Sequence, residues 1–236
     1  MQTISGAGLA IVLVATTHDI RPVAVVIGLV AGVSVAIGLL ALYEALMVGA
    51  MGVVAVLTGL VASALTLWFD VLVAGRAPSP VQVAGMACAI AGAAVSARLG
   101  TLVIRVVVLS LIAGVAFGAS FIAFNLAAGQ SVVTVLFSAR LAAIALLGVI
   151  WALRARPRLT VHPLIAVAGA LDTVANLLML VAVSIMPVSL ATAISSADPP
   201  IITMFLARFV LGEGLPRLAY LSVALASAGI GLMFIG

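Results

Sequence analysis

The stretch PVSLATAISSADPPIITMFLARFVLGEGLP, residues 187–216, decides the fold, because the chain contains a second version of it. Residues 51–80, MGVVAVLTGLVASALTLWFDVLVAGRAPSP, form a similar apolar run that also ends in Gly and Pro. In the apolar run that follows each version, two small residues lie seven apart, Ser222 and Gly229 in one and Gly85 and Gly92 in the other. The offset is the same for both pairs (222 − 85 and 229 − 92 give 137). We therefore interpret residues 187–236 as a second copy of residues 51–99, with an offset near 137 throughout, which is an internal duplication.

The composition places the chain in a membrane. Hydrophobic residues make up 66% of its 236 residues, charged residues make up 7%, and the mean hydropathy is +1.49. A soluble domain carries about 25% charged residues, so this chain lacks the polar surface that water requires. The net charge of +4 comes from arginine, which in a membrane protein reports topology rather than binding to nucleic acid. The single cysteine, Cys88, lies in an apolar run and indicates packing.

Proline and glycine divide the chain into segments of membrane-spanning length. One crossing needs about 20 apolar residues, and we expect an all-α, polytopic membrane bundle of about nine helices. The first helix is short and lacks the positive segment of a signal peptide, so we expect a shortened membrane helix there. The predicted helices cover residues 3–17, 22–47, 51–74, 80–97, 102–126, 131–153, 162–185, 188–211 and 216–235.

The two copies are predicted to be inverted in the membrane. The helix at 22–47 corresponds to the one at 162–185, and these equivalents are five crossings apart, which is an odd number. We expect an N-terminally shortened first repeat over residues 1–99 and a second repeat over 102–236. Inverted halves can expose one site to each side in turn, and such duplicated chains are typical of membrane transporters.

Arginine counting predicts an orientation. Loops on one side carry two arginines, and loops on the other side carry seven. The positive-inside rule makes the second side cytoplasmic, together with the N-terminus. The two groups are Arg21 and Arg76 on one side, and Arg98, Arg105, Arg154, Arg156, Arg158, Arg208 and Arg217 on the other.

Three charged residues, Arg140, Asp172 and Asp198, are predicted near the middle of the bilayer. Such a residue costs about 2.5–3.5 kcal/mol on insertion scales, so it normally faces a partner or a wet cavity. One arginine against two carboxylates leaves a negative charge, which a coupling proton or a cationic ligand would neutralise. The alternative is a structural salt bridge between Arg140 and one aspartate, with the other aspartate neutral.

Polar residues near these charges are further candidates. Pro199 and Pro200 free backbone carbonyls beside Ser195, Ser196 and Thr203, which predicts a polar notch or, alternatively, a simple kink with back-bonded hydroxyls. Asn176 lies one turn from Asp172 and either binds ligand or satisfies Asp172.

The remaining polar residues are predicted to lie at helix ends. Tyr43 and Glu44 lie within a turn of a helix end, where they either reach the membrane interface or contact ligand. Asp70 is expected at the interface. The spacings Gly28 to Gly32 and Gly114 to Gly118 predict close helix contacts within the chain. The sequence contains no nucleophile–base set, phosphate loop or metal cluster, so it predicts neither an enzyme nor a cofactor or metal site.

The order of these motifs resembles the drug/metabolite transporter superfamily, specifically its ten-helix EamA-type members. The stretch from Ser195 to Thr203, followed by Leu211-Gly212-Glu213, resembles the family pattern Ser-Leu-Tyr-Pro-x-x-Thr to Leu-Gly-Glu, with Ala197-Asp198 in place of Leu-Tyr. Arg140 in Ser138-Ala139-Arg140-Leu141 matches an arginine that the family carries in the second helix of a repeat. Leu171-Asp172 to Asn176 and Ala41 to Leu46 also resemble family sequences. The similarity covers residues 20–236.

The resemblance implies a permease that moves small organic metabolites or drugs, often outward, through a central cavity between two five-helix repeats. It implies alternating access without ATP, and a ten-helix fold that here lacks its first helix. It also places the arginines of 154–158 outside, opposite to the arginine count. The expected partners are the lipid bilayer, a small-molecule substrate and a coupling proton, and the expected location is a bacterial inner membrane. The other hypothesis is a truncated or non-transporting membrane partner or regulator.

Overall fold

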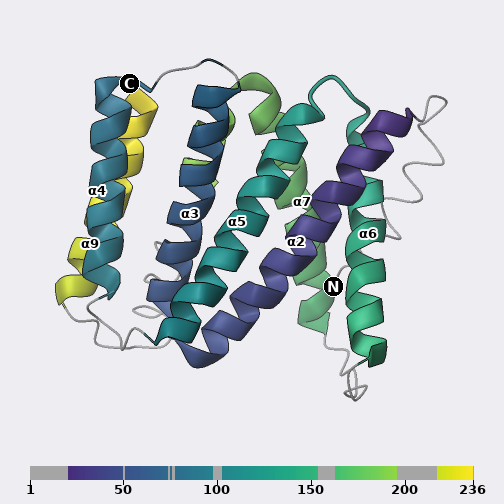
Figure 1. Ribbon diagram of the computed structural model, residues 1–236, viewed down its shortest axis with the longest axis horizontal. Helices are drawn as coiled ribbons and strands as arrows, with labels where there is room; N and C mark the ends of the chain where they lie inside the picture. Colours follow the sequence, from purple (N-terminus) through teal and green to yellow (C-terminus); the bar gives the residue numbers. More distant parts are fainter. Residues whose placement is uncertain are drawn as a thin grey trace. The chain divides into compact units, whose positions relative to one another are not determined.

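All regular secondary structure in the described residues is α-helical. The computed structural model describes residues 21–49, 51–73, 75, 78–97, 103–153, 163–195 and 217–235 (Figure 1). A further helical run covers 188–195. The expected helix at 3–17 and residues 196–211 of the one at 188–211 lie outside the described residues. The helices are α2 (Pro22–Val48), α3 (Met51–Leu72), α4 (Pro80–Ala97), α5 (Ile104–Leu126), α6 (Val132–Leu153), α7 (Pro163–Ile185) and α9 (Arg217–Ile235).

Proline sets several of these helix starts. The helices α2, α4 and α7 each begin at a proline, a residue suited to the first helical position because its missing N–H would have no partner there. At α4 the start is reinforced by a capping box. The N–H of Ser79 donates to Gln82 Oε1 at 2.9 Å, and the N–H of Gln82 donates to Ser79 Oγ at 3.2 Å. The bounds of these seven helices agree with the predicted bounds to within two residues.

Four helical stretches in the described residues are long and apolar enough to cross a bilayer. They are Pro22–Val48, Val53–Leu72, Ile104–Leu126 and Val132–Leu153, of 20 to 27 residues each. Shorter apolar stretches cover Pro80–Ala89, Gly169–Ile185 and Tyr220–Met233. Several such stretches are expected of a multi-pass membrane protein. The count of about nine crossings and the inversion of the repeats stay predictions.

The chain forms two compact units. The first unit comprises Met1–Ala36 and Ala119–Met186, and the second comprises Ile37–Gly118 and Pro187–Gly236. Each unit therefore takes segments from both predicted repeats. The assignment of repeats to 1–99 and 102–236 concerns sequence equivalence and stays a prediction.

In the first unit, glycines bring α2 onto α6. A Cβ atom on Gly28 would collide with the side chain of Ser138 and the carbonyl of Val135, and one on Gly32 would collide with the backbone of Ala139. Small residues allow this approach, as is usual where helices pack within a membrane. The predicted close contact within the chain at Gly28 and Gly32 is thus confirmed.

In the second unit, α5 packs on α3 in the same way. A Cβ atom on Gly114 would meet Val61 and the carbonyl of Thr58, and one on Gly118 would meet Leu65. This confirms the predicted close contact at that glycine spacing. A buried apolar cluster of Ala45, Val54 and Val106 joins α2, α3 and α5 in this unit.

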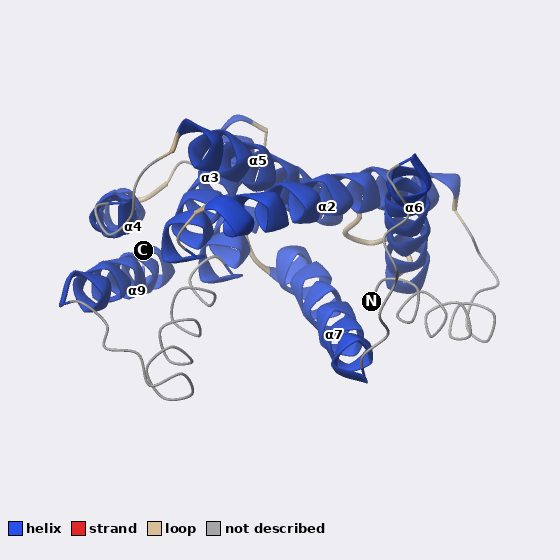
Figure 2. Ribbon diagram, turned by 90° about the horizontal axis from the view of Figure 1, so that it is seen from below, coloured by secondary structure: helices blue, strands red, loops and turns tan. Residues whose placement is uncertain are grey.

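The second unit also contains an intimate pair, α4 and α9, which lie side by side (Figures 1 and 2). The two backbones touch where Gly85 meets Gly229, because a Cβ atom on either would lie 2.5 Å from the carbonyl oxygen of the other. Met233 also contacts Gly85, and Ala89 contacts Gly229, so the two helices run in opposite directions. The inversion of the repeats, which predicts antiparallel equivalents, stays a prediction.

Candidate functional site

A buried ion pair links α6 to α7 in the first unit. Arg140 lies eight residues into α6, about 12 Å along its axis. Its Nη1 lies 2.6 Å from Oδ2 of Asp172, which occupies the tenth position of α7. The arginine side chain is 5% exposed and the aspartate side chain is 23% exposed. The arginine is thus sealed inside the unit, while the carboxylate keeps an open edge.

Small neighbours make room for the guanidinium group. Ala139, Ala142 and Ala143 are buried next to Arg140 along α6. The hydroxyl group of buried Ser138 donates hydrogen bonds to the backbone carbonyls of Thr134 and Val135 in the preceding turn. The hollow beside Arg140 measures about 10 Å³, close to the least volume that holds one water molecule. Its lining comprises Gly32, Val35, Phe124, Leu136, Ala139, Arg140, Ala143 and Asn176.

Asn176 completes the polar group. Its Nδ2 donates to the backbone carbonyl of Asp172 at 2.7 Å and to Asp172 Oδ1 at 3.3 Å. One carboxylate oxygen therefore faces the guanidinium and the other faces the amide. Of the alternatives left open by the sequence, the structure shows that Asp172 is a partner of Arg140 and that Asn176 satisfies Asp172. We call Arg140, Asp172 and Asn176 the α6–α7 polar group.

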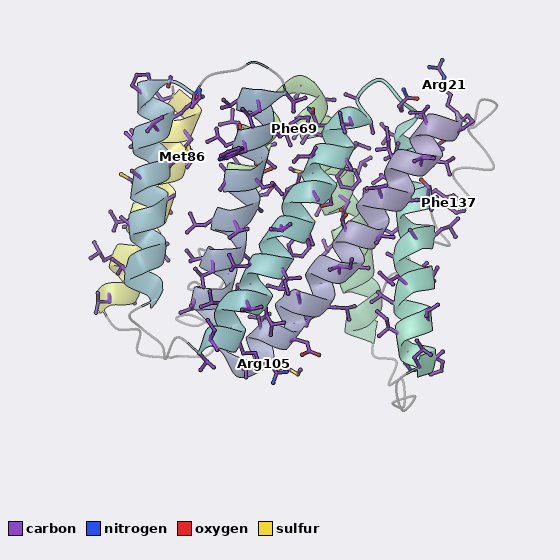
Figure 3. All side chains as sticks on the ribbon, viewed as in Figure 1. Arg21, Phe69, Met86, Arg105 and Phe137 are labelled. Carbon is purple, nitrogen blue, oxygen red and sulfur yellow. The ribbon has the colours of Figure 1, made fainter. Side chains whose placement is uncertain are left out.

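The α6–α7 polar group suits exchange of charged partners. A cation that reaches the open edge of Asp172 competes with Arg140, and an anion competes with Asp172 for the guanidinium group. Either exchange leaves the displaced partner without its counter-ion, at a cost of several kcal/mol, unless the incoming molecule carries both charges. Figure 3 labels Phe137, which lies on α6 three residues before Arg140.

The predicted notch around Asp198 is described only at its start. Ser195 is exposed at the end of the run 188–195 in the second unit. Ser196, Asp198 and Thr203 lie outside the described residues. The predicted gathering of Arg140, Asp172 and Asp198 therefore stays a prediction, of which the structure brings together the first two.

Tyr43 and Glu44 lie at an exposed ion pair in the second unit. Tyr43 is 54% exposed. Glu44 Oε2 lies 3.2 Å from Arg105 Nη2, with side chains 31% and 63% exposed, and Arg105 is labelled at the start of α5 in Figure 3. This geometry agrees with the interfacial alternative for Glu44. An exposed pair of this kind contributes about 0–1 kcal/mol.

Asp70 is the residue that sequence reasoning misjudged. It was expected at the interface, but it is 3% exposed near the end of α3. Its Oδ2 accepts the backbone N–H of Ser189 at 2.8 Å and the hydroxyl of Ser189 at 2.5 Å. Ser189 is the second residue of the run 188–195, so Asp70 caps a helix that follows it by more than a hundred residues. The available signal was an acid near one helix end and a helix start after Met186-Pro187, but nothing in the sequence pairs them.

A family model described as the EamA-like transporter family matches residues 104–235, which is more than half of the chain. The chain belongs to the EamA-like transporter family. The match begins at α5 and ends with α9, so it includes the whole α6–α7 polar group. The resemblance predicted from the motifs is confirmed.

A solved structure shares the fold. Its title is "Crystal structure of protein", and it aligns with a TM-score of 0.61 and 17% identity over 99% of this chain and 98% of that chain. At this identity the likeness concerns the fold alone. No curated protein matches the sequence. Together with the four spanning stretches, EamA-like membership identifies a multi-pass membrane protein of a transporter family.

Proposed function

We propose that this EamA-like protein is a permease that moves small organic metabolites or drugs across the membrane by alternating access. Family membership supports the transport class, and the internal duplication predicted from the sequence would give two halves that exchange conformations. The α6–α7 polar group is the solute-binding part of this proposal.

The observation that carries the proposal is the asymmetry of the ion pair. Arg140 is 5% exposed at its side chain and lines a small hollow together with Asn176, whereas the side chain of Asp172 is 23% exposed. A pair that served packing alone would gain nothing from an open carboxylate edge at mid-helix. A solute with a positive group gains there a partly buried carboxylate that Asn176 holds in place.

The charges favour a solute with a positive group, or coupling to a proton. Arg140 and Asp172 neutralise one another, and Asp198 adds a second carboxylate to the mid-membrane set predicted from the sequence. A positive group or a proton would balance that excess. For Ser195, Ser196 and Thr203 we propose that they supply neutral hydrogen bonds to the solute.

Transport by the purified full chain in liposomes tests the proposal. Three probes cover the charge classes: ethidium as a cation, radiolabelled leucine as a zwitterion and radiolabelled uridine as a neutral solute, each with and without an imposed pH gradient. We expect at least one to move faster than through protein-free liposomes. Asp172→Asn and Arg140→Gln should lower that rate at least tenfold.

The matched control is Arg105→Gln, which removes an exposed arginine from its ion pair with Glu44. It should keep the parent rate, while circular dichroism and gel filtration show that all three variants remain folded. Movement of none of the probes would contradict the permease assignment. Equal rates for Asp172→Asn, Arg140→Gln and the parent would leave transport in place and remove the α6–α7 polar group from it.

A further inference from the structure

The second unit contains a larger cavity, separate from the α6–α7 polar group. Its volume is about 200 Å³, and its walls come from α3, α4, α9 and the start of the run 188–195. Met86, one of the lining residues, is labelled on α4 in Figure 3, and Phe69, labelled on α3, precedes the lining residue Asp70 in the chain. This volume equals that of about seven water molecules, at roughly 30 Å³ each.

A buried carboxylate lines this cavity. Asp70 is 3% exposed, and both hydrogen bonds that it accepts from the described residues end on Oδ2. No arginine or histidine in the described part of the chain forms an ion pair with it. The N–H of Ser189 and the start of a helix offset part of its charge. Its Oδ1 accepts nothing from the described residues and is left to the cavity that Asp70 lines.

The other walls combine neutral donors with apolar surface. Gln82 uses Oε1 in the capping box of α4, so its Nε2 protons are not spent on that contact. The hydroxyl group of Ser63 is also on the wall. Leu67, Met86 and Met233 cover the apolar part. Methionine side chains are flexible and polarisable, and they adapt to ligands of different shapes.

From these features we propose that the cavity beside Asp70 binds a small organic cation, with its ammonium group at the carboxylate and a short alkyl body against the methionines. A buried carboxylate oxygen that accepts nothing from the described residues gains a charge-assisted hydrogen bond from an ammonium group. Hard metal cations prefer to be surrounded by several oxygen ligands, whereas much of this cavity wall is carbon and sulfur. The available volume suits an alkylammonium of four or five carbons. The proposal concerns binding in the second unit and is independent of the transport proposed for Arg140 and Asp172.

Equilibrium binding to the full chain in detergent micelles tests the site without any transport step. The probe is n-butylammonium, measured by isothermal titration calorimetry, and its neutral counterpart is 1-butanol. We expect saturable binding of the amine and at least tenfold weaker binding of the alcohol. Asp70→Asn should weaken amine binding at least tenfold and leave the alcohol unchanged.

A second variant keeps the test decisive if Asp70→Asn does not fold. Met86→Trp fills the cavity and retains the carboxylate, so it should also abolish saturable amine binding. Its matched control is Met47→Trp, which replaces an 80% exposed methionine in the same unit and should bind the amine as the parent does. Amine binding that survives both Asp70→Asn and Met86→Trp would overturn the proposal. Sodium chloride that displaces the amine at equal concentration would also overturn it, since the cavity would then be an inorganic cation site.

Discussion

Replacing Asp172 should lower the free energy of unfolding more than replacing Arg140, although either change breaks the same ion pair. Asp172→Ala leaves a guanidinium group whose side chain is 95% buried without its counter-ion. A broken buried pair costs about 3–5 kcal/mol, and insertion scales give about 2.5–3.5 kcal/mol for a charge at mid-membrane. We therefore expect Asp172→Ala to lower the free energy of unfolding by about 3–4 kcal/mol.

Arg140→Met removes the charge and keeps most of the apolar stem. The carboxylate that remains has a 23% exposed side chain and still accepts the amide of Asn176. Its loss of a partner should cost about 1–2 kcal/mol, within the usual range for an unsatisfied buried group. In the double variant neither charge is stranded, so its cost should be smaller than the sum of the single costs by about 2–3 kcal/mol.

Equilibrium unfolding of the four proteins in mixed micelles of dodecyl maltoside and SDS, followed by far-ultraviolet circular dichroism, gives this cycle. A coupling energy below about 0.5 kcal/mol would refute the reasoning, because contacting charges that share a buried site are expected to couple more strongly. So would a larger cost for Arg140→Met than for Asp172→Ala, since the burial of the two side chains predicts the opposite order.

Three further outcomes follow from the packing and the caps. Gly85→Leu should separate α4 from α9, because its Cβ atom alone would lie 2.5 Å from the Gly229 carbonyl oxygen. The free energy of unfolding should fall by at least about 2 kcal/mol, as for a severe overpacking change. An unchanged free energy would contradict the close approach. Ser79→Ala removes one half of the capping box and should lower the free energy of unfolding by about 1 kcal/mol. A thermal melt measures this loss, and an unchanged melting midpoint would contradict it. Arg105→Gln should change the free energy of unfolding by less than about 1 kcal/mol, because its pair with Glu44 is exposed, and a larger loss would show that the pair is not interfacial.

Helix positions were predictable from the sequence, for physical reasons that can be named. The prolines at 22, 80 and 163 fix the first turn of their helices, so local chemistry determined those starts. Close helix contacts were also predictable, because Gly28 and Gly32 present no side chain to obstruct a neighbour. The identity of that neighbour, α6, required the three-dimensional arrangement.

The candidate site was predictable in part. Composition makes any buried charge in this chain costly, so Arg140 and Asp172 stood out, but charge alone could not say which aspartate is the partner of Arg140. Asp70 was misjudged because a position near a helix end is compatible with either solvent or a distant helix start. Its bonds to Ser189 bridge 119 residues, and no local pattern encodes that contact.

The most direct test of the proposed site asks whether water and solute reach the α6–α7 polar group. The change is Asn176→Cys in a Cys88→Ala background, with Leu178→Cys, a 62% exposed apolar position on α7, as the matched control. A membrane-impermeant thiol reagent is applied to each face of proteoliposomes, with and without a transported probe. We predict that Cys at 176 reacts from both faces, that the probe slows the reaction, and that Cys at 178 stays inert. Failure of the reagent to reach position 176 from either face would contradict a solute path along Arg140 and Asp172.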